Sequence, residues 1–301
     1  MEQNHGILMD SGTNELEIVE FTIGQSKFGI NVIKVREIIN PLPITPVPRS
    51  HPNVEGIIEL RGEVLPVINV ADAIGFPPSN EPAYDKYIVT EFNKTKMVFH
   101  VHTVSQIHRI SWAQIEKPNE MYQGLETQIT GVVKHKGEMI LLLDFEKMVV
   151  EINEETAISK KKLNHLEQRE VSKKPIYIAE DSPLLRTLIK DTLKEAGYVN
   201  TLFFENGKDL FEDISSNINS GKKLTDFVKL IITDIEMPQM DGHHLTRKIR
   251  EDKVLSELPI IIFSSLITDS LKHKGDQVGA TAQVSKPEIG ELVQLIDKYI
   301  L

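Results

Sequence analysis

The sequence predicts two domains of different fold class. In the N-terminal half, short apolar runs separated by turn residues predict an all-β fold, and the pattern of one hairpin recurs 75 residues later. In the C-terminal half, four apolar runs each end in polar or charged residues, which predicts an α/β fold with an open, doubly wound parallel sheet. A chain of 301 residues is long enough for two domains that each bury a core.

Composition and charge exclude several classes of function. The formal net charge of -10 argues against a nucleic-acid partner, and the absence of cysteine excludes disulfides, thiol catalysis and zinc–cysteine sites. No apolar stretch approaches the roughly 18 to 20 residues of a membrane span, and residues 1–10 lack the features of a secretory signal. No glycine-rich nucleotide loop is present, so we expect no kinase activity of its own. We therefore expect a cytoplasmic protein that does not insert into the membrane.

The first expected elements are strands at 18–23 and 27–30, joined by a turn at 24–26. After them, apolar residues from Val32 to Ile39 recur at the spacing of a single helix face, and Pro41 would end that helix. The sequence thus predicts a mainly β domain with one helical interruption.

A hairpin pattern occurs twice in this half. The run GIIELRGEVLPVIN at 56–69 is similar to GVVKHKGEMILLLD at 131–144, and in each copy two apolar arms flank a turn of charged residues and glycine. Gly62 and Gly137 are free to take positive φ in these turns. Two related subdomains, each a small barrel, would produce the repeat; a chance likeness of two hairpins is the alternative. A helix is expected to begin at residue 144.

Residues 16–152 resemble the CheW-like coupling domain of bacterial chemotaxis. The resemblance rests on FGI at 28–30, VIKVREI at 32–38, TPVP at 45–48 and above all GIIELRG at 56–62. It implies a pair of five-stranded barrels that bind the signalling tips of chemoreceptors and the regulatory domain of the chemotaxis histidine kinase. It also implies binding roles for Arg61, Val35 and Glu37, with a solvated turn the alternative for Arg61 and a core position the alternative for Val35.

Charged residues dominate the segment from Thr156 to Lys174, which is typical of a linker or of a solvated extension of the preceding helix. We therefore expect four parts. These are an N-terminal tail (1–15), a CheW-like domain (16–155), a charged linker (156–174) and a second domain (175–301).

In the second domain, polar residues follow four apolar runs. The runs at 175–179, 228–233, 258–263 and 280–285 are expected strands, and the carboxyl ends of parallel strands meet at one edge of the sheet. Three carboxylates at that edge would repel one another unless a cation neutralised them, and all-oxygen ligation suits Mg²⁺. The stretch 215–221 has the composition of a surface loop. The residues expected at the edge are Glu180, Asp181, Asp234, Ser264 and Lys286.

Residues 175–301 resemble the receiver domain of two-component response regulators, which implies a flavodoxin-like sheet of five parallel strands. The spacing agrees, because 30 positions separate Asp234 from Ser264 and 22 separate Ser264 from Lys286. The resemblance implies that Asp234 accepts a phosphoryl group, with Ser264 and Lys286 contacting its oxygens. One departure is Gln283, which stands where many receivers carry an aromatic switch residue.

The same resemblance implies a magnesium site. Its expected ligands are Glu180, Asp181, Asp234 and the backbone carbonyl of Glu236.

A coupling domain followed by a receiver is the arrangement of CheV-type chemotaxis proteins. We expect an adaptor that couples receptors to the kinase within receptor arrays, is regulated by phosphorylation of Asp234 from the kinase's phosphohistidine domain, and is not itself an enzyme. Two alternatives remain open: a phosphate sink that drains the kinase, and a constitutive structural scaffold.

Overall fold

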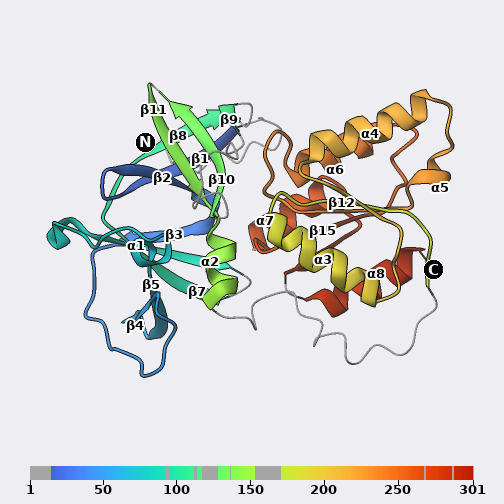
Figure 1. Cartoon of the computed structure of the whole chain (residues 1–301). Coiled ribbons are helices and arrows are strands. Elements are labelled where there is room, and N and C mark those ends of the chain that lie inside the picture. The colour runs from blue at the N-terminus through green and yellow to red at the C-terminus, as the bar shows by residue number, and fades with distance from the viewer. Residues whose placement is uncertain are drawn as a thin grey trace, which may run out of the picture.

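The computed structural model describes residues 15–92, 95–111, 114–116, 128–135, 137–152, 171–267, 269–286 and 288–300. Residues 1–14 of the expected tail and most of the expected linker lie outside these residues, and Glu15 already belongs to the first strand. Two β-sheets fill the N-terminal half, and a helix-covered parallel sheet fills the C-terminal half (Figure 1). In the described part of the chain, no helix is long and apolar enough to span a membrane.

The N-terminal half contains one sheet for each copy of the repeated hairpin. The first sheet has the strand order β8-β1-β2-β11-β10-β9 and the second the order β3-β6-β7-β5-β4. The predicted pair of β subdomains is confirmed, and the first has six strands because the two-residue strand β9 adds to its edge. The strands are β1 (Glu15–Ile23), β2 (Ser26–Asn31), β3 (Val35–Ile39), β4 (Val54–Leu60), β5 (Glu63–Asn69), β6 (Lys86–Phe92), β7 (Thr95–Val101), β8 (Thr103–Ser111), β9 (Ile115–Glu116), β10 (Ile129–His135) and β11 (Glu138–Leu143).

The repeat has the same geometry in both copies. Strands β4 and β5 pair as β10 and β11 do, and both ladders shift register near the start, between Val54 and Gly56 and between Ile129 and Gly131. The turn glycines take positive φ, +83° at residue 62 and +86° at residue 137, as expected. A helix follows each copy: α1 (Val70–Ala73) after β5 and α2 (Phe145–Ile152) after β11.

The helix expected between residues 32 and 39 is wrong. The chain forms a single 3-10 turn, η1 (Val32–Lys34), capped by the Asn31 side chain, and then continues as β3. Burial alternates along β3, and its backbone pairs with β6. The β-branched residues of this segment favour the strand, and pairing with a neighbour overrides the weak helical spacing.

The C-terminal half is a doubly wound parallel sheet, as predicted. Its strand order is β13-β12-β14-β15-β16. Helices α3 and α8 pack on one core cluster, which includes Ile189 and Val293, and α4 and α6 pack on the other, which includes Ile214 and Leu245. The elements are β12 (Ile176–Ala179), α3 (Pro183–Glu195), β13 (Thr201–Phe204), α4 (Gly207–Asn219), α5 (Leu224–Phe227), β14 (Leu230–Thr233), α6 (Gly242–Glu251), β15 (Ile260–Ser264), α7 (Asp269–Gln277), β16 (Ala282–Ser285) and α8 (Ile289–Ile300), with a further 3-10 turn η2 (Pro82–Tyr84) in the N-terminal half.

The surface loop expected at 215–221 is also wrong for most of its length, because α4 continues to Asn219. Ile214 is fully buried and Ile218 packs against the same cluster, so the apolar stripe extends into this stretch. Ser215 and Asn217 return hydrogen bonds to carbonyls one turn earlier, of Phe211 and Asp213, and so remain compatible with the helix.

Candidate functional site

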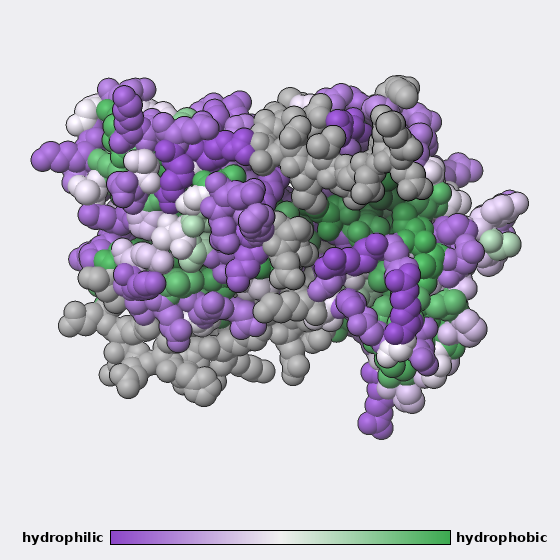
Figure 2. Space-filling view, turned by 180° about the vertical axis from the view of Figure 1, so that it is seen from behind, coloured by the Kyte–Doolittle hydropathy of each residue, from purple (hydrophilic) through white to green (hydrophobic). Residues whose placement is uncertain are grey.

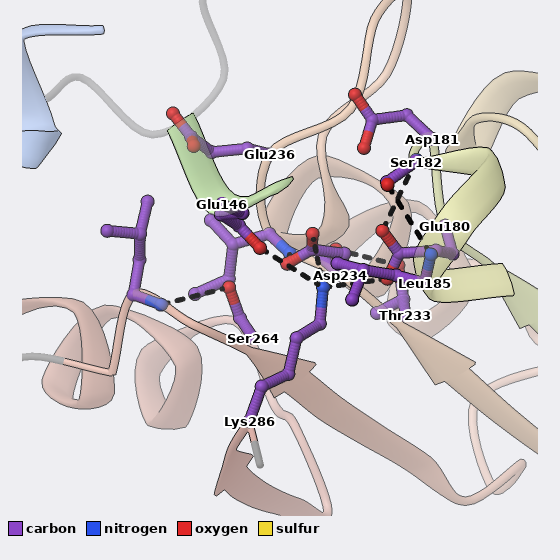
Figure 3. Close-up of polar contacts among 12 residues, drawn as sticks. Glu146, Glu180, Asp181, Ser182, Leu185, Thr233, Asp234, Glu236, Ser264 and Lys286 are labelled. Carbon is purple, nitrogen blue, oxygen red and sulfur yellow. Dashed lines mark hydrogen bonds and ion pairs between the residues drawn. The ribbon is translucent and has the colours of Figure 1, made fainter. Parts of the chain in front are cut away.

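The polar residues predicted for the sheet edge do come together there. Glu180 and Asp181 follow β12, Asp234 follows β14, Ser264 ends β15 and Lys286 follows β16. These four strands are neighbours in the sheet, so their carboxyl ends meet in one pocket (Figure 3).

Lys286 joins two of the carboxylates. Its Nζ lies 2.7 Å from Glu180 Oε2 and 3.0 Å from Asp234 Oδ2. The second oxygen of Asp234 accepts a hydrogen bond of 2.6 Å from the Ile235 amide. All three charged side chains are almost completely buried. Burial lowers the pKa of Lys286, but the attraction of Asp234 and Glu180 outweighs it and raises that pKa well above its usual value.

The acidic residues form a set of oxygen donors that fits Mg²⁺. One carboxylate oxygen from each of Glu180, Asp181 and Asp234 lies within 4.8 Å of the others. Burial, with the neighbouring negative charges, raises the pKa of Asp181 well above its usual value and that of Glu180 to about 8. Keeping all three carboxylates ionised therefore requires more positive charge than Lys286 supplies, and hard oxygen ligands of this kind suit a divalent cation.

Arg186 on α3 holds the backbone of Glu180 and Asp181 in place. Its Nη1 donates to the carbonyl oxygens of Glu180 at 2.8 Å and of Asp181 at 2.9 Å. Ser182 caps the same helix by accepting from the Leu185 amide. Neither residue was predicted for the site, because an arginine one turn into a helix is ordinary on a protein surface.

Ser264 lies at the carboxyl end of β15, as expected, and Gln283 lies within β16. The Ser264 hydroxyl is buried and accepts a hydrogen bond of 3.3 Å from the Leu266 amide, so its predicted contact with a phosphoryl oxygen remains a prediction. The Gln283 amide donates to the Lys272 carbonyl at 2.6 Å and to Asp276 at 2.7 Å. The residue at the usual position of an aromatic switch thus fastens β16 to α7.

The pocket is covered by residues from the N-terminal domain, which sequence analysis did not find. The Glu236 side chain accepts a hydrogen bond from Asn31 and forms an ion pair of 2.5 Å with Lys34 of η1. Glu146, in the first turn of α2, lies 3.9 Å from Lys286 Nζ. An acid in the first turn of a helix is common for electrostatic reasons, so nothing in the sequence around Glu146 indicates this role. The role of the Glu236 backbone carbonyl remains a prediction.

The residues predicted to bind other proteins lie on the second sheet. Arg61 takes positive φ (53°) in the turn between β4 and β5, and its Nη2 forms an ion pair of 2.7 Å with Glu37 on β3. Both residues line an open depression of about 390 Å³. Val35 instead packs, partly buried, against the core of the N-terminal domain.

Comparison with known proteins assigns a family to each half. The CheW-like domain model matches residues 17–153, and the response regulator receiver domain model matches residues 176–297. The chemotaxis protein CheV3 of Helicobacter pylori is 30% identical over 97% of this chain and 96% of its own length. CheV2 of the same organism is 27% identical over 95% of both chains. The chemotaxis protein CheW of Thermotoga maritima is 32% identical over 46% of this chain and 90% of its own.

These matches extend over both domains in a single relative, in the same order and over nearly the whole length of each chain. The chain therefore belongs to the CheV family of chemotaxis proteins, in which a CheW-like coupling domain precedes a response regulator receiver domain.

Proposed function

We propose that this protein couples chemoreceptors to the chemotaxis histidine kinase through its CheW-like domain, and that phosphorylation of Asp234 regulates this coupling. The observation that carries the proposal is the convergence of Asp234, Glu180, Asp181 and Lys286 on one pocket at the carboxyl edge of the receiver sheet.

In the proposed reaction, an Asp234 carboxylate oxygen attacks the phosphorus of a phosphohistidine in line. The O–P bond forms as the N–P bond breaks, and the imidazole nitrogen keeps the electron pair and then takes a proton from solvent. Lys286, already 3.0 Å from Asp234, would pair with a phosphoryl oxygen. The Ser264 hydroxyl would donate to another, after giving up its present bond with the Leu266 amide.

Glu180, Asp181, Asp234 and the Glu236 carbonyl would hold Mg²⁺. When bound, the ion neutralises charge that develops on the transferring phosphoryl oxygens. The close spacing of three carboxylates around one lysine supports this assignment, because all three can be ionised together only with a further compensating cation.

The coupling surface is proposed to include Arg61, Glu37 and Val35. The Arg61 side chain is 77% exposed, and its ion pair with Glu37 lies at the depression that both residues line. Figure 2 shows hydrophobic side chains gathered over this N-terminal domain, whereas the receiver is mostly polar on the same face. An accessible arginine is a frequent anchor of protein interfaces, and Val35, partly buried against the N-terminal core, would contribute apolar area to the same surface.

The first test is phosphoryl uptake. Full-length protein is incubated with the phosphorylated histidine domain of the kinase and Mg²⁺, and bound phosphoryl is measured by intact mass. We expect one phosphoryl group on wild type and none on Asp234→Asn. The matched control is Asp226→Asn, an exposed acid before β14, which should behave as wild type.

The second test is kinase output with receptor membranes. Unmodified protein is compared with the beryllofluoride adduct at Asp234, and we expect the two to support different kinase activity. Equal output from both, and from Asp234→Asn, would favour a constitutive scaffold instead. A phosphoryl lifetime much shorter than the kinase's own turnover would favour a phosphate sink.

A further inference from the structure

The N-terminal domain occupies the mouth of the phosphoacceptor pocket with charged side chains. Glu146 on α2 lies 3.9 Å from Lys286 Nζ on one side and 3.5 Å from Lys34 Nζ on the other. Lys34 also pairs with Glu236, and the Ser182 hydroxyl lies 3.5 Å from Asp144 Oδ2. Figure 3 shows Glu146 pointing from α2 toward Lys286 and Asp234.

Apolar contact supports the same arrangement. Ile33, between the capping Asn31 and Lys34, packs against a receiver cluster that includes Ile235, Leu266 and Leu271. Its neighbour Val32 packs instead against the N-terminal core. The turn η1 therefore presents one apolar and one cationic side chain to the receiver.

This docking leaves little access to the phosphoacceptor. Asp234 is 3% exposed and the Glu146 side chain is 14% exposed. A phosphohistidine must bring its phosphorus to within roughly 3 to 3.5 Å of the attacking oxygen, in line with it. The donor and the docked α2 would compete for the same approach.

Glu146 also holds a charge where a phosphoryl group would hold one. Burial raises its pKa, but the attraction of Lys286 and Lys34 outweighs this and lowers it, so the carboxylate stays ionised. A phosphorylated Asp234 carries about two negative charges in place of one, and the phosphoryl group needs Lys286 as its own partner. Two anions would then share one buried cation, and like charges at short range repel strongly.

We propose that Glu146 acts as an internal substitute for the phosphoryl group: its ion pair with Lys286 holds the coupling domain over the receiver, and phosphorylation of Asp234 displaces it and separates the two domains. This inference rests on the proposed function, since it concerns the regulation of the same pocket. The equilibrium is linked in both directions, so the domain separation that phosphorylation favours also favours phosphorylation.

The test measures the distance between the domains in the full-length chain. The sequence has no cysteine, so the exposed pair Asn80→Cys and Ser220→Cys can carry two spin labels, one on each domain. Distances are recorded without ligand and with Mg²⁺ and beryllofluoride. Wild type is compared with Glu146→Gln, and the matched control is Glu151→Gln, an exposed acid on the same helix whose ion pair within the described part of the chain is with Lys147.

We expect wild type and Glu151→Gln to show a short distance that lengthens with the beryllofluoride adduct. Glu146→Gln should populate the long distance without any adduct and should take up phosphoryl from acetyl phosphate several-fold faster, because the competent state is no longer a minor one. Lys34→Gln removes the other cation paired with Glu146 and should also lengthen the distance between the domains. This second variant keeps the inference testable if Glu146→Gln folds poorly.

The outcomes separate the inference from the proposed function. If the adduct forms, as seen by mass, and the wild-type distance stays short, the inference is overturned and the proposed function stands. The same holds if Glu146→Gln and Lys34→Gln both keep the short distance. If Asp234 accepts neither adduct nor phosphoryl in any variant, the proposed function and the inference fail together.

Discussion

At the scale of single residues, the pocket depends on two backbone segments that approach closely. A Cβ added at Gly242, the first residue of α6, would lie 1.9 Å from the carbonyl oxygen of Asp234. The Gly242 amide donates to the Ile235 carbonyl at 2.9 Å, which fastens the loop after β14 to the helix. Glycine is needed there because no side chain fits between them.

We expect Gly242→Ala to lower the free energy of unfolding by about 3 kcal/mol or more, since the clash is with backbone that cannot rotate away. Urea denaturation of the full chain measures this loss. The comparison is Gly221→Ala, where the added Cβ meets nothing within 4 Å but φ is +84°. That backbone strain alone costs about 1 to 2 kcal/mol. Losses of equal size would contradict the steric argument.

His243 gives a prediction about pH. It is buried in α6, its Nε2 has no hydrogen-bond partner among the described residues, and burial lowers its pKa to about 4. Asp241 opposes this shift, and Lys274 and Arg247 support it. The unfolded chain binds a proton near pH 6.5, so stability from the neutral ring is complete above pH 6.5 and is lost as pH falls toward 4.

Between pH 6.5 and 4, the free energy of unfolding is expected to fall by about 3 kcal/mol, because each unit of difference between the two pKa values is worth roughly 1.4 kcal/mol. Urea denaturation at several pH values between 7 and 4 should show a shallower dependence for His243→Phe than for wild type. His273→Phe, at an exposed position on α7, should keep the wild-type dependence. Parallel curves for all three proteins would show that the pKa of His243 is the same in the folded and unfolded states.

At the scale of elements, the sequence predicted structure best where the apolar pattern allowed one solution. The receiver strands β12, β14 and β15 are continuous β-rich runs, and buried parallel strands are the arrangement that such runs favour. The helix predicted at residues 32–39 was wrong because the spacing of their apolar residues fits a helix face. Their conformation is instead determined by pairing with β6, which is distant in sequence.

The loop predicted at the end of α4 was wrong for the opposite reason. Its polar composition suggested a loop, although the apolar residues within it continue the buried face of the helix. Ser216 is exposed on this helix, and its carbonyl accepts from the Ser220 amide at 3.0 Å. We expect Ser216→Pro to cost about 3 kcal/mol or more, because proline removes a helical hydrogen bond and clashes with the preceding turn. Ser216→Ala should be neutral or slightly stabilising. Thermal unfolding measures both, and similar values for the two variants would indicate a loop.

At the scale of the whole molecule, the candidate site divides into a part that sequence reveals and a part that it does not. Glu180, Asp234 and Lys286 could be found because strand ends at one sheet edge are a consequence of topology. Glu146 and Lys34 could not, because their place depends on how two separately folded domains dock. No local pattern within either domain records which side chains of one domain meet those of the other.

Each domain has its own core, and the apolar contact between them passes through the cluster that Ile33 joins. When two docked domains unfold in sequence, the interface is lost with the first, so it stabilises only that transition. Loss of interface contacts should therefore lower the first melting temperature and leave the second unchanged. This holds whichever domain melts first.

Ile33→Ala tests this coupling by calorimetry of the full chain. Removing a partly buried side chain at the interface should cost roughly 1 to 2 kcal/mol of unfolding free energy through lost apolar burial. This loss should lower the melting temperature of the first transition by about 3 to 6 °C. The control is Ile38→Ala on β3, because that side chain is 41% exposed and should shift neither transition. If Ile33→Ala also leaves both transitions in place, the two domains unfold independently and the docked arrangement contributes nothing to stability. A shift of the second transition alone would instead place Ile33 in the core of the more stable domain.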